Sequence, residues 1–306
     1  MTEQMDTSTQ MLPKRGRGRA AASDDLIEAM REIAEAAQPI TGRGVGYKLF
    51  TKDLIDSMAQ MPKVYKLLKI AREEGTIPWE WIVDETRKVE RVPTWADPEE
   101  FSDCVATSYR RDFWKQQPER CEVWSEKGTI RGLLKPVLDE YAVDFRVLHG
   151  FGPATILHEV AEDDSNRDEL LNILYVGDYD PSGMFMSEVD IPKRLEKYGG
   201  GGYIAVKRIA LVDDGNMLNG LSSFPASDKG PKNGKGGDPR YKWFVKNYGR
   251  KCWEIDAMDP TELRDLVEVE IKLCIEPGEW GRCEKINRAE QASLRTVLDE
   301  WKGARL

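Results

Sequence analysis

From residue 121 onward, short apolar runs alternate with stretches of helical periodicity. The runs CEVWS, FRVLH, NILYVG and YIAVKRIALV predict strands, and the segments between them, 129–141, 153–163 and 184–198, predict helices. A strand followed by a crossover helix and another strand builds a parallel sheet with helices packed on it. The pattern therefore predicts a three-layer α/β fold, in which ligands bind at the carboxyl ends of the strands.

The rest of the chain predicts a second unit and connecting segments. Residues 23–100 contain helical stretches, the first with Ser23 placed to cap it, followed by the strand-like TIPWEWIVDETR. This order is typical of a winged-helix-like DNA-binding domain, and it also suits any small helical bundle. The remaining boundaries we expect are a disordered basic tail over 1–22, a linker over 101–120, the α/β domain over 121–275 and a C-terminal helical segment over 276–306.

Composition limits the chemistry. The 306 residues include only two histidines, and the five cysteines form no CxxC pair, which excludes the usual zinc spacings and favours carboxylates, tyrosine or another metal as the reacting groups. No apolar run approaches the ~18 residues of a membrane span, and the N-terminus has no hydrophobic signal region. We expect no membrane contact and a cytoplasmic protein, nucleoid-associated if it is bacterial or from a phage.

The charge is unevenly distributed. The net charge of −9 taken alone argues against a nucleic-acid partner. However, the stretch from Lys229 to Lys251 holds eight basic residues and one acid, a local 8 − 1 = +7. Such a stretch is either a solvated loop or a phosphate-contacting segment. In the second interpretation Lys232, Lys235 and Arg240 bind DNA.

The stretch LYVGDYDPSGM ends a predicted strand in two aspartates. A type I turn accounts for Asp180, Pro181 and Gly183, because these residue types are favoured at its first, second and fourth positions. It does not account for Asp178, since a charge beside a buried strand is costly unless solvent or a cation meets it. Two carboxylates at i and i+2 can share a small hard cation such as Mg²⁺. A calcium loop is excluded because its twelfth position is Val189.

Further acids follow other predicted strands. Glu126, in CEVWSEKGTIRGLL, lies between a strand and a helix, where it either joins the aspartate pair or complements the helix dipole. Glu254 and Asp256, in CWEIDAMD, either position a ligand or belong to the region that caps the next helix. Asp259-Pro260-Thr261-Glu262 predicts the start of that helix, with a capping box.

Glu126, the glycine-containing HGFGP and the later GDYDPSG together resemble a Toprim domain. The Asp-x-Asp-Pro-x-Gly form is similar in particular to the A subunit of type VI topoisomerase and its relatives, the meiotic double-strand-break proteins. This resemblance covers roughly 120–275. It implies magnesium-dependent DNA cleavage in which Glu126, Asp178 and Asp180 bind the metal and Glu126 also acts as general acid or base. It further implies a homodimer and, because no GxxxxGK[ST] loop occurs here, a separate ATPase subunit.

Those relatives carry a winged-helix domain whose tyrosine attacks the DNA phosphodiester, in a motif of Arg, three residues, then Tyr. GRGVGYKLF offers Arg43 and Tyr47. The sequence departs from the family in having Gly46 where an aromatic residue is usual, and its glycines disfavour a helix. The resemblance implies that Tyr47 is the nucleophile and that Arg43 contacts phosphate.

Tyr47 as a packing residue is the alternative. In that case the acidic triad activates water, as in Toprim nucleases. A third interpretation is a non-catalytic DNA-binding protein that acts with a partner.

Overall fold

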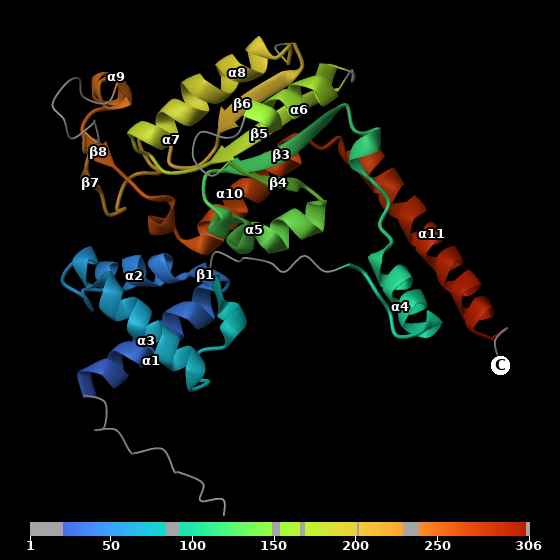
Figure 1. Cartoon of the computed structure of the whole chain (residues 1–306), viewed down its shortest axis with the longest axis horizontal. Coiled ribbons are helices and arrows are strands. Elements are labelled where there is room, and N and C mark those ends of the chain that lie inside the picture. Colours follow the sequence, from blue (N-terminus) through green and yellow to red (C-terminus); the bar gives the residue numbers. More distant parts are fainter. Residues whose placement is uncertain are drawn as a thin grey trace, which may run out of the picture.

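A parallel sheet organises the chain (Figure 1). The computed structural model describes residues 21–83, 92–148, 154–165, 169–200, 202–228 and 239–303. Its four-stranded sheet has the order β4-β3-β5-β6, and every pairing in it is parallel. The strands are β3 (Glu119–Ser125), β4 (Asp144–Val147), β5 (Leu170–Val176) and β6 (Ile204–Arg208). The predicted α/β class with a parallel sheet is confirmed.

Helices cover both faces of the sheet. The connecting elements are α5 (Gly128–Tyr141), α6 (Ala154–Ser165), α7 (Pro181–Phe185), the π-helical segment η4 (Met186–Asp190), α8 (Ile191–Lys197) and α10 (Pro260–Leu273). One face packs on α5 and α10, and the other packs on α6, η4 and α8. Because side chains alternate along a strand, Val123 and Leu174 face the first layer while Trp124 and Tyr175 face the second.

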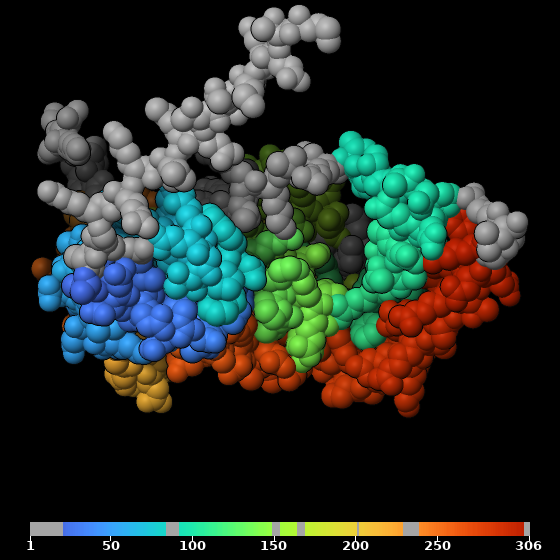
Figure 2. Space-filling view, turned by 90° about the horizontal axis from the view of Figure 1, so that it is seen from below, coloured from blue at the N-terminus to red at the C-terminus, as the bar shows by residue number. Residues whose placement is uncertain are grey.

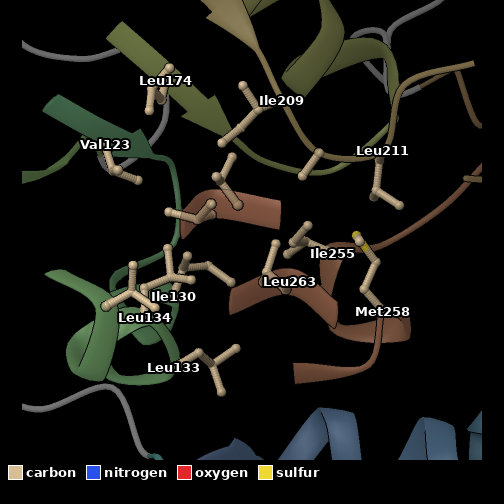
Figure 3. Close-up of a cluster of buried hydrophobic side chains, with 14 of the residues drawn as sticks. Val123, Ile130, Leu133, Leu134, Leu174, Ile209, Leu211, Ile255, Met258 and Leu263 are labelled. Carbon is tan, nitrogen blue, oxygen red and sulfur yellow. The ribbon is translucent and has the colours of Figure 1, made fainter. Parts of the chain in front are cut away.

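The core between the sheet and α5 is drawn in Figure 3. Val123 and Leu174 project from the strands towards Ile130 and Leu134 of α5, and all four side chains are at most 2% exposed. Leu263 of α10 closes the same cluster. The apolar spacing that predicted these elements is therefore the spacing that builds this core.

The N-terminal residues form a helical unit with its own core. It contains α1 (Ala21–Ala37), β1 (Ile40–Thr41), α2 (Gly42–Thr51), η1 (Met58–Gln60), α3 (Met61–Glu73), η2 (Trp79–Trp81) and β2 (Ile82–Val83), and β1 pairs with β2 in parallel. The expectation that Ser23 caps the first helix is wrong, because Ser23 lies inside α1. The α2 helix forms despite its glycines, since the Thr41 hydroxyl caps it by accepting a bond from the Gly44 N–H.

Two helices form an arm beside the sheet (Figures 1 and 2). They are α4 (Pro98–Ser108) and α11 (Pro277–Gly303), and η3 (Trp114–Gln116) lies near their base. Trp280 of α11 meets the rings of Phe113 and Trp114 edge to face, with centroids 4.9 and 5.5 Å away. The predicted linker over 101–120 is corrected, because it contains most of α4 and all of η3. In Figure 2, α5 lies between the N-terminal unit and α4.

The remaining elements follow β6. They are β7 (Phe224–Pro225), α9 (Pro239–Tyr248), β8 (Lys251–Cys252) and η5 (Ile255–Ala257). Of the strand predicted over CWEID, only Cys252 lies in β8; Trp253 forms an isolated bridge with Tyr179, and the 3-10 turn η5 begins at Ile255. The predicted start of α10 is confirmed, with Asp259 as its cap. Within the described segments, no helix combines the length and apolarity needed to cross a bilayer.

Candidate active site at the carboxyl edge of the sheet

The connections of β3 and β5 leave the sheet in opposite directions. β3 leads through α5 to β4 on one side, whereas β5 leads through α7 and α8 to β6 on the other. Such a reversal opens a crevice at the carboxyl ends of the two strands, where open α/β sheets bind ligands. Ser125 and Val176, the last residues of these strands, are paired. Glu126 and Asp178 therefore leave the sheet at the same edge.

Close packing explains the glycines of GDYDPSG. A Cβ on Gly177 would lie 2.7 Å from Tyr175 Cε1, and one on Gly183 would lie 2.3 Å from the Asp178 carbonyl oxygen. Both positions exclude a side chain. Asp180 accepts a 2.7 Å bond from the Gly183 N–H and thereby caps α7. The predicted turn at Asp180 is thus the first turn of a helix that starts directly beside the Asp178 backbone.

A lysine holds Asp178 in place. Lys127 Nζ lies 2.9 Å from Asp178 Oδ1 and 3.0 Å from Asp256 Oδ2. The Ile255 N–H donates to the same Asp178 Oδ1 at 2.8 Å. Asp256 comes within reach because Tyr179 and Trp253 form an antiparallel bridge that brings the 253–256 segment beside residues 177–180, which we call the aspartate loop.

The N-terminal unit is fastened to the same segment. The Thr41 hydroxyl donates to Asp256 Oδ1 at 2.6 Å. Arg43 forms an ion pair with Glu254, and Lys48 forms one with Asp259. A continuous chain of polar contacts thus runs from α2 through Asp256 and Lys127 to Asp178, within a single protein molecule.

A buried arginine supports the aspartate loop. Arg208, on β6, is 8% exposed and donates to the carbonyls of Gly177 (2.9 Å), Asp178 (2.9 Å) and Ala210 (3.0 Å), and to the Ser187 hydroxyl (3.0 Å). Burial lowers the pKa of Arg208. Its guanidinium is a fixed positive charge against the backbone that carries Asp178.

The carboxylates at this edge create a negative field. Burial raises the pKa of Asp178, while Lys127 acts against that rise. The charges of Glu126, Asp178 and Asp180 all act on the phenol of Tyr175, whose pKa is raised chiefly by burial and then by these acids. Burial lowers the pKa of Lys127, but Asp178 and Asp256 outweigh it and the net shift is upward. Lys127 is therefore held in its charged form between the two aspartates.

Tyr47 lies in the interface between α2 and the sheet edge. Its side chain is 5% exposed, and burial, followed by the charge of Glu254, raises its pKa to about 12. It lines a hollow of about 290 Å³ together with Lys48 and Lys52 on one side and the 220–222 and 257–262 segments on the other. The guanidinium carbon of Arg43 lies 5.9 Å from the centre of the Tyr47 ring.

The predicted DNA-contacting residues are divided between described and undescribed parts of the chain. Arg240, on α9, donates to the Ser182 hydroxyl at 3.4 Å and lines a hollow of about 60 Å³ with Asp180. Arg43 is engaged by Glu254. Lys232 and Lys235 lie outside the described residues.

Magnesium was the cofactor expected from the sequence. Among the residues that the structure describes, no three or more His, Cys, Asp or Glu side chains are grouped so that they could hold a metal ion. The residue types still suit magnesium, since three carboxylates follow neighbouring strands, and the two hydrogen bonds to the Asp178 side chain described above both go to Oδ1.

Several residues at this edge were not identified from the sequence. Lys127 follows Glu126 directly, and Arg208 is a charge inside the apolar run YIAVKRIALV, which is the signal of a buried polar contact. Thr41 carries no signal beyond being a common capping residue.

Comparisons with protein-family models, with curated proteins and with solved structures found no match.

Proposed function

We propose that this protein is a magnesium-dependent, Toprim-type enzyme that cleaves DNA strands at the carboxyl edge of its sheet. The observation that carries the proposal is the position of Glu126 and Asp178 after the paired, neighbouring strands β3 and β5, at the reversal of chain direction. Asp180 follows on the same loop as the cap of α7. Phosphodiester cleavage needs a cation where these acids lie, since the reacting phosphate is itself negative.

In this proposal Glu126, Asp178 and Asp180 hold the metal. A Mg²⁺ ion held by them would supply positive charge for the phosphate and would activate water. Glu126 also serves as general acid or base, as the resemblance implies, and Asp180 uses its Oδ1 to cap α7. Arg208 keeps the aspartate loop in position through the Gly177 and Asp178 carbonyls.

Two attacking groups are compatible with this site. In the docked arrangement Tyr47 is buried and its pKa is raised to about 12, which disfavours the phenolate and therefore favours water as the nucleophile. The proximity of Arg43 and the adjoining hollow, which contains Lys48 and Lys52, favour Tyr47 once α2 moves away from Glu254. The two routes differ in product, because only attack by Tyr47 leaves protein covalently attached to a DNA end.

DNA binding is proposed to involve the basic residues around α9. Arg240 lies beside Asp180, so a strand that contacts it would pass over the carboxyl edge. A winged-helix role for the N-terminal unit, a homodimer and a separate ATPase subunit belong to the same proposal. In such a homodimer Tyr47 would act on the acids of the partner subunit, whereas within one chain α2 docks beside Glu254 and Asp259.

Plasmid cleavage tests the proposal. Supercoiled plasmid is incubated with the protein and Mg²⁺, and nicking is followed with and without proteinase treatment before electrophoresis. We expect nicking that EDTA abolishes and that Asp178→Asn removes. The control is Asp190→Asn, a half-buried carboxylate paired with Arg194 on the same helical segment, which should nick like wild type. Equal nicking by Asp178→Asn and wild type would refute the assignment.

The same assay separates the routes. A DNA species that enters the gel only after proteinase treatment, and that Tyr47→Phe eliminates, assigns the tyrosine. Free ends with full activity in Tyr47→Phe assign water. DNA binding without any nicking at any Mg²⁺ concentration would instead favour the non-catalytic interpretation.

A further inference from the structure

Lys127 occupies a position that its own helix does not favour. It is the N-cap residue of α5, with extended backbone angles (φ −100°, ψ 122°) and no side-chain capping bond. N-caps prefer Ser, Thr, Asp or Asn, and a positive charge is unfavourable beside the positive end of a helix dipole. Local structure therefore does not explain a lysine here, whereas its contacts with Asp178 and Asp256 do.

Those contacts are the contacts of a bound cation. The ammonium lies 2.9 Å from Asp178 Oδ1 and 3.0 Å from Asp256 Oδ2, and the side chains of the two aspartates are only 17% and 4% exposed. Two buried carboxylates that share one positive charge form the kind of site that a divalent ion also takes. In two-metal enzymes a pair of ions about 3.5–4 Å apart clamps the reacting phosphate.

We propose that Lys127 is a resident cation that takes the place of a second divalent ion, so that the site takes up one metal ion rather than two. This inference rests on the proposed function for the first ion. Asp178 is shared by the two cations: its Oδ1 accepts a hydrogen bond from Lys127, and its Oδ2 binds the metal ion. Lys127 acts through Asp178 and Asp256, so it is a positioning residue.

The second carboxylate is fixed independently of Lys127. Asp256 Oδ1 accepts a 2.6 Å bond from the Thr41 hydroxyl, which also caps α2 through the Gly44 N–H. The position between Asp178 and Asp256 is therefore held by the fold, and it remains a cation position when the lysine is removed.

Counting bound Mn²⁺ per chain by equilibrium dialysis tests the inference on the full chain. The variant is Lys127→Met, which keeps most of the length of the unbranched side chain and removes the charge. Lys127→Arg keeps the charge. Lys135→Met is the matched control, because it removes a Lys–Asp pair on the exposed side of the same helix. We expect Lys127→Met to bind one ion more than wild type, and both Lys127→Arg and Lys135→Met to bind the wild-type number.

The added ion should disappear in the double variant Lys127→Met, Asp256→Asn. An unchanged ion count in folded Lys127→Met, or two ions in wild type, overturns the inference. If Lys127→Met does not fold, Lys127→Gln, which can still donate a bond to Asp178, is used with the same expectation. Failure of the proposed function is distinguishable, because it appears as no ion in wild type, whereas the inference concerns the difference between variant and wild type.

Discussion

At the scale of single residues, charged groups do most to shape the candidate site. Arg208 donates to two carbonyls of the aspartate loop and to the Ala210 carbonyl, and within the described part of the chain none of its hydrogen bonds goes to a carboxylate. Its role is therefore to hold backbone rather than to neutralise one acid. Removing the guanidinium would take a hydrogen-bond donor from each of these carbonyls. A buried acceptor without a donor is costly.

Replacing Arg208 should consequently destabilise the protein strongly. We expect Arg208→Met to lower the free energy of unfolding by about 2 to 4 kcal/mol, measured by urea denaturation. Arg194→Met is the control, because Arg194 forms an i,i+4 pair with Asp190 on α8 and should cost less than about 1 kcal/mol. Equal effects of the two substitutions would show that the Arg208 hydrogen bonds carry no special weight.

The buried position of Tyr47 should make the stability of the protein depend on pH in the alkaline range. An unfolded tyrosine ionises near pH ~10, whereas the folded pKa of Tyr47 is raised to about 12 by burial and then by Glu254. Between these values the unfolded chain has lost a proton that the folded protein keeps, so stability falls as pH rises.

The measurement is urea denaturation of wild type and Tyr47→Phe over the range from pH ~9 to pH ~12. The stability difference should be constant below pH ~10 and then shift against wild type by up to about 2 to 3 kcal/mol. Tyr47→Phe removes only this titration, which separates it from the other buried tyrosines. If the free energy of unfolding changed with pH in the same way for both proteins, Tyr47 would ionise like an unfolded tyrosine.

At the scale of elements, the sequence predicts what local periodicity encodes. β3, β5 and α5 were predicted because their apolar residues repeat with the periods of a strand or helix, and Asp178 was singled out because it follows such a strand. α4 and α9 were missed because each lies in a polar stretch where composition resembles a loop, and each begins with a proline that also suits a turn. The short turn η5 resembles a strand in the sequence, because its apolar residue Ile255 comes shortly after the apolar end of β8.

Thr41 is the residue on which α2 and the sheet edge both depend. Its hydroxyl accepts from Gly44 at the start of α2 and donates to buried Asp256. Thr41→Val keeps the shape but removes both bonds, and we expect it to lower the free energy of unfolding by about 2 to 3 kcal/mol. Thr41→Ser keeps both bonds and removes one buried methyl group, at a cost of about 1 kcal/mol.

Thermal and urea denaturation of both variants measure these values. A Thr41→Ser variant that is as unstable as Thr41→Val would show that the methyl group, rather than the hydroxyl, matters at this position.

At the scale of the whole molecule, the site depends on pairings that no local pattern encodes. Arg43 and Glu254, and likewise Lys48 and Asp259, are 211 residues apart in the chain. Nothing in the sequence connects the members of each pair, because pairing across that distance follows from how the two units dock. The same docking places Tyr47 beside the 254–259 segment, whose Glu254 and Asp256 charges act on its phenol.

The distribution of surface charge is also a property of the whole molecule. The chain carries −9 overall, yet α9 presents Lys242 and Lys246 on one exposed helical face close to the carboxyl edge. Lys193 and Lys197 have the same i,i+4 spacing and exposure on α8. Because the α7–α8 segment runs back from the carboxyl end of β5 to the start of β6, that second pair lies near the opposite edge of the sheet. The two pairs therefore form a matched comparison.

If DNA crosses the carboxyl edge, only the α9 pair should matter. The double variant Lys242→Glu, Lys246→Glu should weaken DNA binding, and it should reduce the slope of log K against log salt by about 2, since each phosphate that a lysine neutralises adds about 0.9 to that slope. Lys193→Glu, Lys197→Glu makes the same change in net charge and should alter the slope by much less. Fluorescence anisotropy with a labelled duplex over a range of salt concentrations measures both. If both variants bound DNA equally weakly, DNA affinity would depend only on the total charge of the protein. DNA would then have no preferred path across the carboxyl edge of the sheet.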